Sequence, residues 1–462
     1  MTDLAYLATR PQPGPPREYH FPRFERGRLD NGLTVISAQV SGRPLLAAAL
    51  LLPGGAGHEP RTLAGVTSLT ARALSEGTRG RDALEFIEAT ERLGASIGAS
   101  ADWENLSLTM TVPRARLEPA LALLAEMLQE PAFPEPEVER LRAQRLNDLL
   151  QAAAEPSRRA DRAFIGTIYA PSSPYARLLA GDEETVPRLD RAGVEARHAQ
   201  HLDPSRATLI LGGDLTGLDP LALAEAHLGA WRADGAAMEA DLAPLDAAPA
   251  DGRRVRVLDR PGAPQSELRI GHVGLPRRTP DYHATVVMTT MLGGLFNSRL
   301  QRLLREDRGY TYHVSAGFDF RRSAGPFTVR TAVQTEVTAP AVGDVLGVLE
   351  GLSRDPVAAG ELGDAREFLV GVFPLRFESA EQVTGAIAGL VAQGLPDDEL
   401  DRYRPAVAAV SGADVLAAAS HVRPRDASVI VVGDAEQVAG PLEAAGLGPV
   451  EIEAATASAG EG

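Results

Sequence analysis

Two histidine arrangements are the first candidates for metal or acid–base chemistry. His198 and His201 form a His-x-x-His pair, and this spacing places two imidazoles on one face of a helix. The pair belongs to a segment that recurs later in the chain with only its second histidine kept, which favours packing or capping over metal binding. His58 and His313 have no carboxylate at a spacing that implies a partner, so we expect surface or hydrogen-bonded side chains.

Arg305 and Tyr312 are a second pair, seven positions apart in MLGGLFNSRLQRLLREDRGYTYHVSAGFDF, the segment from 291 to 320. Taken alone, so loose a spacing occurs by chance. Arg305 would then be a helix-end cation beside Glu306 and Asp307, and Tyr312 an aromatic residue of a strand. The meaning of the pair therefore depends on the elements that position it.

The sequence contains a repeat of those elements. The segment HLDPSRATLILGGD, from His201 to Asp214, returns as HVRPRDASVIVVGD, from His421 to Asp434, 220 residues later. In each copy a proline-containing turn leads into an apolar run that ends in Gly-Asp, which is typical of a buried strand. Internal repetition of this kind predicts two homologous domains.

The openings of the two halves also correspond. LTVISAQV and LLAAALLLPGG in the first half match RRVRVLDR and SELRIGHVGLP in the second, each pair reading as two strands joined by a turn. Helical periodicity follows in RLEPALALLAEMLQE and PEVERLRAQRLNDLLQ, and NLSLTMTV alternates like a half-buried strand. We predict an α+β protein of two tandem domains, each an antiparallel-rich sheet with helices packed on one face.

The domain boundaries follow from composition. Residues 18–237 and 253–450 are predicted to be the two domains, joined by an Ala-, Asp- and Pro-rich linker at 238–252. Residues 1–17 and 451–462 are predicted to be flexible extensions.

The strand end LLLPGG is followed by GVTSLTARALSEGT, from Gly65 to Thr78. The glycines that border this helix resemble those of the zinc-binding helix in the pitrilysin/insulinase family of zinc peptidases. That family follows a strand ending in Gly with Gly-x-x-His-x-x-Glu-His and then Gly-Thr, so that two histidines bind zinc and the glutamate activates a water. The ligand and base positions fall on Ser68, Ala71 and Arg72, none of which does the family's task.

The family's third, acidic ligand lies in a later helix. The matching stretch, LRAQRLNDLLQAAAEP, carries Asn147 and Asp148 at that point. One Asp without imidazoles is a poor zinc site, and an Arg at a ligand position repels the metal. The resemblance therefore implies a degenerate zinc motif at Ser68, Ala71, Arg72 and Asp148, with no metal or other cofactor in this chain.

The second half resembles the family more closely. Family members use an Arg and a Tyr, seven positions apart across a helix-to-strand turn, to contact substrate opposite the zinc, and the match here is Arg305 and Tyr312. Arg305 would hold a substrate carbonyl through its fork of donors, and the Tyr312 hydroxyl would donate to the oxyanion that forms as water attacks. Tyr310 falls two residues short of that spacing.

Two further groups are candidates for substrate binding through the same resemblance. Ala101, Asp102 and Trp103 lie near the family's edge strand, onto which an extended peptide adds, although in a metal-free half this strand also suits a chamber wall or an interface. Gly293 and Gly294 lie where related processing peptidases carry a glycine-rich loop, and a helix-packing role is equally plausible.

The resemblance implies a zinc-free subunit of a bacterial heterodimeric zinc endopeptidase. A homologous His-x-x-Glu-His partner would hold the zinc, and this chain would add Arg305 and Tyr312 in trans to cut peptides, with leader-peptide removal as one substrate hypothesis. The rivals are an inert scaffold subunit, like the peptidase-derived core proteins of respiratory complexes, and a peptide-binding homodimer.

Composition agrees with a globular protein and excludes several other classes. The apolar fraction is 44% and the charged fraction 23%, and cysteine is absent, which excludes disulfides, thiol nucleophiles and cysteine-ligated metals in this chain. A net charge of −16 opposes nucleic-acid binding. No apolar run reaches membrane-spanning length and no signal-peptide pattern opens the sequence, so we expect a cytoplasmic protein with no membrane partner. All 46 basic residues are Arg, which is typical of GC-rich bacterial coding.

Overall fold

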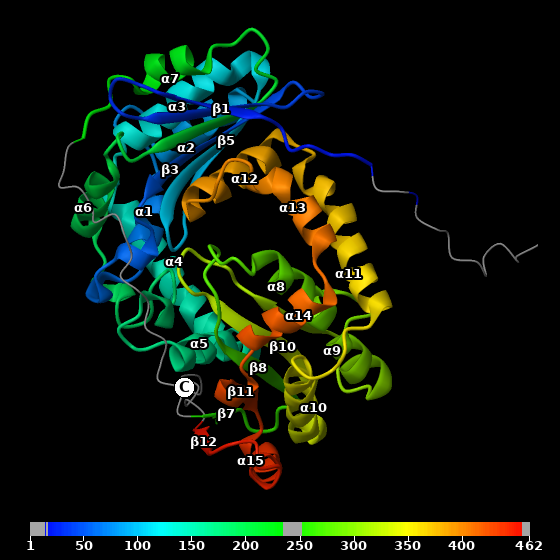
Figure 1. The fold of residues 1–462 in the computed structure, drawn as a ribbon. Helices are drawn as coiled ribbons and strands as arrows, with labels where there is room; N and C mark the ends of the chain where they lie inside the picture. The colour runs from blue at the N-terminus through cyan, green and yellow to red at the C-terminus, as the bar shows by residue number, and fades with distance from the viewer. Residues whose placement is uncertain (1–13, 15–16, 234–251, 455–462) are drawn as a thin grey trace, which may run out of the picture.

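The computed structural model describes residue 14 and residues 17–233 and 252–454, which form two sheets with surrounding helices (Figure 1). The predicted linker at 238–252 lies almost wholly outside the described residues. The same holds for the predicted extension at 1–17 and for the tail beyond Ala454.

The first half builds a six-stranded sheet in the order β1-β2-β6-β3-β5-β4. Its neighbours pair antiparallel except β2 and β6, which run parallel. The strands are β1 (Phe24–Arg28), β2 (Thr34–Gln39), β3 (Leu45–Pro53), β4 (Ser96–Ala101), β5 (Asn105–Pro113) and β6 (Thr208–Gly213). The helices are α1 (Val66–Ala73), α2 (Ala83–Arg92), α3 (Leu117–Gln129), α4 (Glu135–Ala154), α5 (Pro156–Ile168), α6 (Arg191–His201) and α7 (Pro220–Leu228).

The second half repeats this sheet in the order β12-β7-β11-β8-β10-β9, again with β7 and β11 parallel. Its strands are β7 (Arg254–Asp259), β8 (Gln265–Val273), β9 (Val314–Phe318), β10 (Pro326–Gln334), β11 (Ser428–Gly433) and β12 (Val450–Glu453). Its helices are α8 (Tyr282–Thr289), α9 (Arg299–Gln301), α10 (Thr338–Gly351), α11 (Ala359–Val372), α12 (Ala380–Gln393), α13 (Glu399–Ala409), α14 (Gly412–Ala418) and α15 (Ala435–Ala444). The predicted duplication and fold class are confirmed.

One predicted boundary moves. The tail was expected to begin at residue 451, but β12 pairs in parallel with β7 through Glu453, so the second half extends to that residue. This strand occupies the edge position that β1 occupies in the first sheet. The first sheet is therefore completed by a strand near the start of the chain, and the second sheet by a strand near its end.

Each sheet buries both faces, because the two halves exchange a helix. In β6, Leu209 and Leu211 face the helices of the first half, whereas Ile210 packs with Val383 and Ile387 of α12, from the second half. A central strand covered on both sides needs a continuous apolar run, and the sequence TLILGG of β6 supplies one.

The reciprocal exchange places α5, from the first half, against the second sheet. Its buried stripe of Ala160, Phe164 and Ile168 packs on a face that includes Ile430 and Val432 of β11. The neighbouring Val429 and Val431 point to the helices of the second half. Figure 1 shows α12 beside the upper sheet and α5 beside the lower one.

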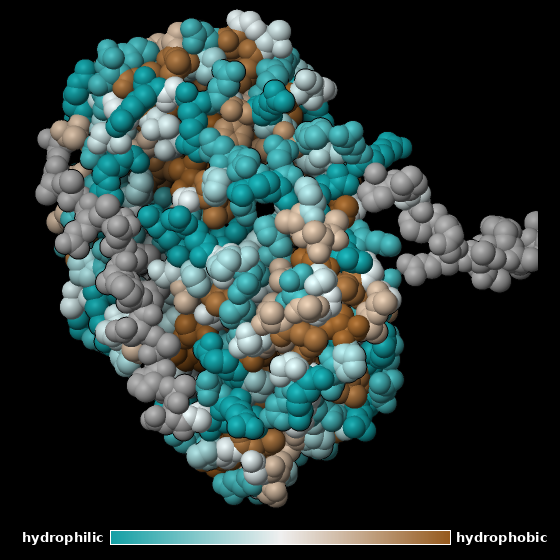
Figure 2. Space-filling model, in the orientation of Figure 1, coloured by the Kyte–Doolittle hydropathy of each residue, from teal (hydrophilic) through white to brown (hydrophobic). Residues whose placement is uncertain are grey.

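Helix length and surface composition add two observations. Among the described residues, no single helix is long and apolar enough to cross a membrane, and one pair bent by 110°, Glu399–Ala409 with Gly412–Asp426, passes that test together by length and composition only. In the view of Figure 1 the surface is mostly hydrophilic, and hydrophobic residues appear as separate patches (Figure 2).

The helix exchange makes a testable prediction about stability. Phe164 is 2% exposed between α5 and the second sheet, so Phe164→Ala leaves a cavity there and should lower the free energy of unfolding by about 3–5 kcal/mol in urea denaturation. Phe368→Ala, at a position 46% exposed on α11, is the control and should change it by less than about 0.5 kcal/mol. Equal effects of the two substitutions would contradict this packing.

Candidate active-site half

Arg305 is positioned by a π-helical turn. α9 continues into this turn, Arg302–Asp307, which is anchored by the fully buried side chain of Leu304. The backbone N–H groups of Arg308 and Tyr310 donate to the carbonyls of Leu303 and Leu304 and close the turn. Turns of this kind are rare and recur at functional sites.

Tyr312 lies in the short segment between that turn and β9. The Thr331 hydroxyl, on β10, donates to the His313 carbonyl at 2.9 Å and lies 3.0 Å from the Thr311 hydroxyl, so the backbone on both sides of Tyr312 is held. The Tyr312 side chain is 85% exposed. A rigidly held backbone therefore presents a phenol that points away from the core.

The two side chains meet, as the sequence predicts. The guanidinium carbon of Arg305 lies 5.1 Å from the ring centroid of Tyr312 and 4.4 Å from that of Phe296. Both contacts fall within cation–π range. Phe296 is 66% exposed, and its only signal in the sequence is an aromatic residue shortly after two glycines.

The donors of this stack are unused within the described part of the chain. Neither the guanidinium of Arg305 nor the hydroxyl of Tyr312 makes a hydrogen bond or ion pair there. The stack fixes the position of Arg305 through its aromatic neighbours and leaves its N–H groups available to a ligand.

Arg305 and Tyr312 border a groove of about 800 Å³. Its floor is the second sheet and one wall is α5, which contributes Ser157 and Asp161. Arg269, on β8, is buried beneath it and donates to Asp161 at 2.6 Å and to Glu267 at 2.9 Å. The remaining lining residues are Gln265, Gly309, Tyr310, Thr311, His313, Ser315, Arg330, Thr331, Ala332 and Gln334.

The helix that carries the degenerate zinc motif is intact. The carboxylate of Glu59 accepts the backbone N–H groups of Gly65 and Thr67 and so caps the start of α1. Ser68 is half-buried and Ala71 is buried, so neither offers a metal ligand at a free surface. Arg72 is exposed and donates to the Gln144 side chain on α4 at 2.8 Å.

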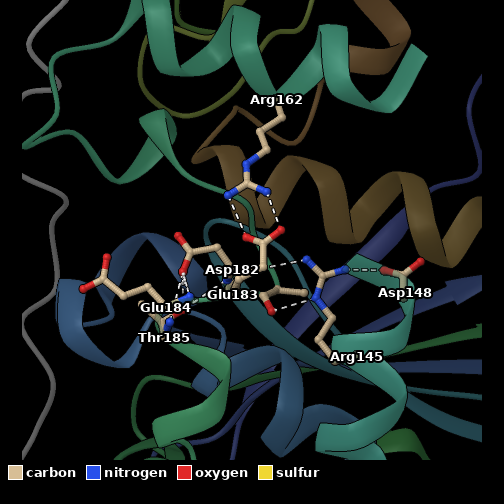
Figure 3. Close-up of polar contacts among 9 residues, drawn as sticks. Arg145, Asp148, Arg162, Asp182, Glu183, Glu184 and Thr185 are labelled. Carbon is tan, nitrogen blue, oxygen red and sulfur yellow. Dashed lines mark hydrogen bonds and ion pairs between the residues drawn. The ribbon is translucent and has the colours of Figure 1, made fainter. Parts of the chain in front are cut away.

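Asp148, at the acidic position of the motif, is paired with two arginines. Its carboxylate pairs with Arg145, one turn earlier on α4 (Figure 3). It also accepts from Arg158 on α5 at 2.9 Å. Burial raises the pKa of Asp148, but the hydrogen bond from Arg158 and the charge of Arg145 outweigh it and hold this pKa below its ordinary value. Asn147 is exposed.

The described residues do not fit a zinc ion. They contain no group of three or more His, Asp or Glu side chains that could hold a metal. In Figure 1, α1 lies on one side of the molecule and α9 on the other, so the degenerate motif and the Arg305–Tyr312 pair do not meet within one chain.

Of the three residues predicted on the edge strand, only one lies on it. Ala101 ends β4, which is the edge strand of the first sheet. Asp102 and Trp103 instead form the turn that follows, and their carbonyls accept N–H groups of Ala56 and Gly57. Their role in binding substrate stays a prediction, and only Ala101 belongs to the edge strand itself.

Gly293 and Gly294 differ in their surroundings. A Cβ on Gly293 would lie 2.5 Å from the backbone nitrogen of Ala316, so this glycine allows a helix end to pack on β9. Gly294 is exposed and has no such contact closer than 3.5 Å. The packing role applies to Gly293, while substrate contact by either residue stays a prediction.

The His-x-x-His pair has a structural role. His198 bonds through its Nε2 to the Leu128 carbonyl at 2.7 Å, and the two ring nitrogens of His201 lie 2.8 and 2.9 Å from the carbonyls of Arg197 and Gly54. Burial, followed by the charge of Arg197, lowers the pKa of His201 to about 4. Packing is therefore the better account of this pair.

Comparison with known proteins gives the family. The model described as insulinase (peptidase family M16) matches residues 34–173, and the model described as peptidase M16 inactive domain matches residues 188–369. The Non-peptidase homolog YmxG of Helicobacter pylori is 24% identical over 353 residues, which cover 75% of this chain and 79% of that protein. An uncharacterized zinc protease of Mycobacterium tuberculosis is 25% identical over 377 residues, 80% of this chain and 84% of that protein.

A solved structure gives the same answer. The crystal structure of a peptidase M16 inactive domain from Pseudomonas fluorescens superposes with a TM-score of 0.82 at 25% identity, covering 89% of this chain and 98% of that one. The chain belongs to the insulinase family of peptidases, family M16. Its first helix has Ser68, Ala71 and Arg72 where the family has its zinc ligands and base, and residues 188–369 match the inactive-domain model.

The site makes a prediction about metal content. After incubation with zinc and removal of free metal, the purified chain should hold far below one zinc per molecule, because Ser68, Ala71 and Arg72 replace the ligands and base and Asp148 is paired with arginines. Elemental analysis measures this directly. One tightly held zinc per chain would contradict the assignment.

His201 makes a second prediction, about pH. Its pKa is about 4 in the folded protein and about 6.5 when exposed, so between these values the unfolded chain binds more protons. The free energy of unfolding should therefore fall as the pH drops from 6.5 to 4, by about 3 kcal/mol from this residue.

Urea denaturation at pH 7.5, 5.5 and 4.5 measures that loss. His201→Gln should be less stable at pH 7.5 but should lose less stability on acidification than the unmodified chain. Parallel pH profiles of the two proteins would refute the neutral, buried state of His201.

Proposed function

We propose that this chain is the zinc-free subunit of a heterodimeric zinc endopeptidase. Its partner would be a homologous subunit carrying His-x-x-Glu-His and the zinc, and this chain would complete the partner's site with Arg305 and Tyr312. The main support is the exposed Phe296–Arg305–Tyr312 stack, which holds unused donors at the rim of a groove. A site with donors but no metal ligands can take part in zinc-dependent hydrolysis only where another chain supplies the metal.

The proposed chemistry divides between the two subunits. The partner's zinc would supply an activated water, and the described residues of this chain would take no part in that activation. Arg305 would hold a carbonyl of the bound peptide, and the Tyr312 hydroxyl would donate to the oxyanion that forms on the attacked carbonyl. A preorganised donor of this kind typically contributes about 2.7–4 kcal/mol at the transition state.

The substrate in this proposal is a peptide or an unfolded segment in extended form. The groove of about 800 Å³ runs beside Arg305 and Tyr312 between α5 and the strands of the second sheet, which suits a chain of several residues. Removal of a leader from a bacterial peptide precursor in the cytoplasm is the specific reaction that we propose. The edge strand at Ala101 would add main-chain contacts to a bound peptide.

Tyr312→Phe tests the oxyanion role directly. The substitution keeps the ring that lies against Arg305 and removes only the hydroxyl, so binding to the partner should be unchanged while kcat falls by about a hundredfold. The measurement is peptide cleavage by the reconstituted pair, together with the Kd of complex formation.

Tyr403→Phe is the matched control. Tyr403 is buried in the core of the second half and does not line the groove, so loss of its hydroxyl should leave kcat nearly unchanged. Full activity of Tyr312→Phe in an active pair would overturn the catalytic role and favour a scaffold subunit. Homodimers without a zinc-bearing partner would favour the peptide-binding alternative.

A further inference from the structure

A second cavity lies on the opposite side of α5 from the groove. It measures about 680 Å³ and is enclosed by α4, α5, the loop Leu178–Glu183 and the outer strands of the second sheet. It is lined by Arg145, Leu149, Ala152, Ala153, Arg158, Arg159, Arg162, Ala163, Leu178, Leu179, Ala180, Glu183, Arg256, Leu258 and Glu453. Arg305 and Tyr312 are not among these residues, so the cavity is distinct from the proposed active-site half.

The cavity is positive in an acidic protein. Five of its lining residues are arginines and two, Glu183 and Glu453, are acidic. Asp148 pairs with two of the arginines from outside the lining, so an excess of two positive charges remains in a chain of net charge −16. Clefts lined by one sign of charge raise the local concentration of ligands of the opposite sign. An anionic ligand is therefore favoured here over the rest of the surface.

Three of the arginines are engaged in holding the walls together. Arg162 forms a two-pronged pair with Glu183, with both distances 2.7 Å (Figure 3). Arg145 donates to the carbonyls of Ala180 and Gly181 and pairs with Asp148. Arg256 donates to Glu453 and to the Thr167 hydroxyl.

The other two arginines retain unused donors. Arg158 makes one hydrogen bond, from Nη2 to Asp148, which leaves its remaining N–H groups without a partner in the described part of the chain. Arg159 is half-buried and makes no hydrogen bond or ion pair with any described residue. Guanidinium groups match carboxylates with two parallel hydrogen bonds, so these two can receive an oxyanion.

Their place on α5 is unfavourable for the helix itself. Arg158 and Arg159 lie in its first turn, which has no acidic residue and no capping side chain. The helix dipole favours anions at that end and disfavours cations. Asp148 compensates Arg158, whereas Arg159 has no compensating contact in the described part of the chain, and a local arrangement that costs stability without one indicates a functional position.

The remaining wall is apolar. Leu149, Leu178, Leu179 and Leu258 line the cavity together with three alanines of α4 and α5. A ligand that fills this space therefore carries an anionic group next to an apolar one. The free carboxylate and the apolar side chain of a peptide's last residue have this combination.

We infer that this cavity binds the C-terminal end of a peptide whose last residue is apolar. Arg158 and Arg159 receive the terminal carboxylate, and the leucine-lined wall receives the side chain. The inference does not depend on the proposed peptidase activity, because it requires neither the partner nor zinc.

The test uses the full chain and a pair of fluorescent pentapeptides. One is an alanine-rich peptide ending in Leu with a free carboxylate, and the other is the same peptide with a C-terminal amide. Fluorescence anisotropy should show that the carboxylate form binds at least about tenfold more tightly, since the amide removes the charge that the arginines receive.

Substitution of Arg159 localises the site. Arg159→Gln should weaken binding of the carboxylate peptide about tenfold and should not lower the unfolding temperature, because Arg159 has no partner in the described part of the chain. Arg116→Gln is the control, since Arg116 is exposed before α3 and does not line the cavity; it should bind the peptide like the unmodified chain.

Three results would overturn the inference. Equal binding of the carboxylate and amide peptides would exclude recognition of the terminus. Unchanged binding by Arg159→Gln would place the peptide elsewhere. Displacement of the peptide by inorganic phosphate at concentrations below the peptide's own Kd would identify a phosphate site instead.

Discussion

The exchange of one helix between the two halves is the constraint on which the other features depend. Each sheet has two apolar faces, and its own helices cover only one of them. The second face is closed by α5 in one case and by α12 in the other, so neither half buries its core alone. Because burial of apolar area is the main stabilising term in folding, this exchange couples the two halves into one body.

α5 shows how one buried stripe organises the chemistry around it. With Ala160, Phe164 and Ile168 fixed on the second sheet, the helix has only one rotational setting. Ser157 and Asp161 then face the groove that contains Arg305 and Tyr312, and Arg158, Arg159 and Arg162 face the positive cavity. The pair between Asp161 and the buried Arg269 adds a polar contact that holds the same setting. One helix of the first half thus shapes two spaces on the second.

The sequence predicts the parts of this structure that depend on local pattern. The two copies 220 residues apart correspond to β6 and β11, and the helical and strand periods locate α3, α4 and β5 to within about three residues. The proximity of Arg305 and Tyr312 could be predicted because a helix-to-strand turn brings residues at this spacing close together. The helix exchange could not be predicted from the sequence, since the apolar stripe of α5 is compatible with packing on either sheet. The contact of Phe296 with Arg305 and the pairing of β12 with β7 likewise join residues whose proximity only the tertiary fold creates.

The loss of the metal site is more than a loss of histidines. A metal ligand set leaves its carboxylate to be neutralised by the ion, whereas here Arg145 and Arg158 already neutralise Asp148 and keep its pKa low. The same two arginines also line the positive cavity, and Arg145 holds the loop at Ala180 and Gly181. Removal of either guanidinium would leave Asp148 with a single arginine, and removal of Arg145 would also take the donor from the carbonyls of Ala180 and Gly181. If histidines were restored on α1, the carboxylate of Asp148 on α4 would still be paired with arginines and would not be free to bind zinc. The arginines therefore stabilise the zinc-free form of α1 and α4.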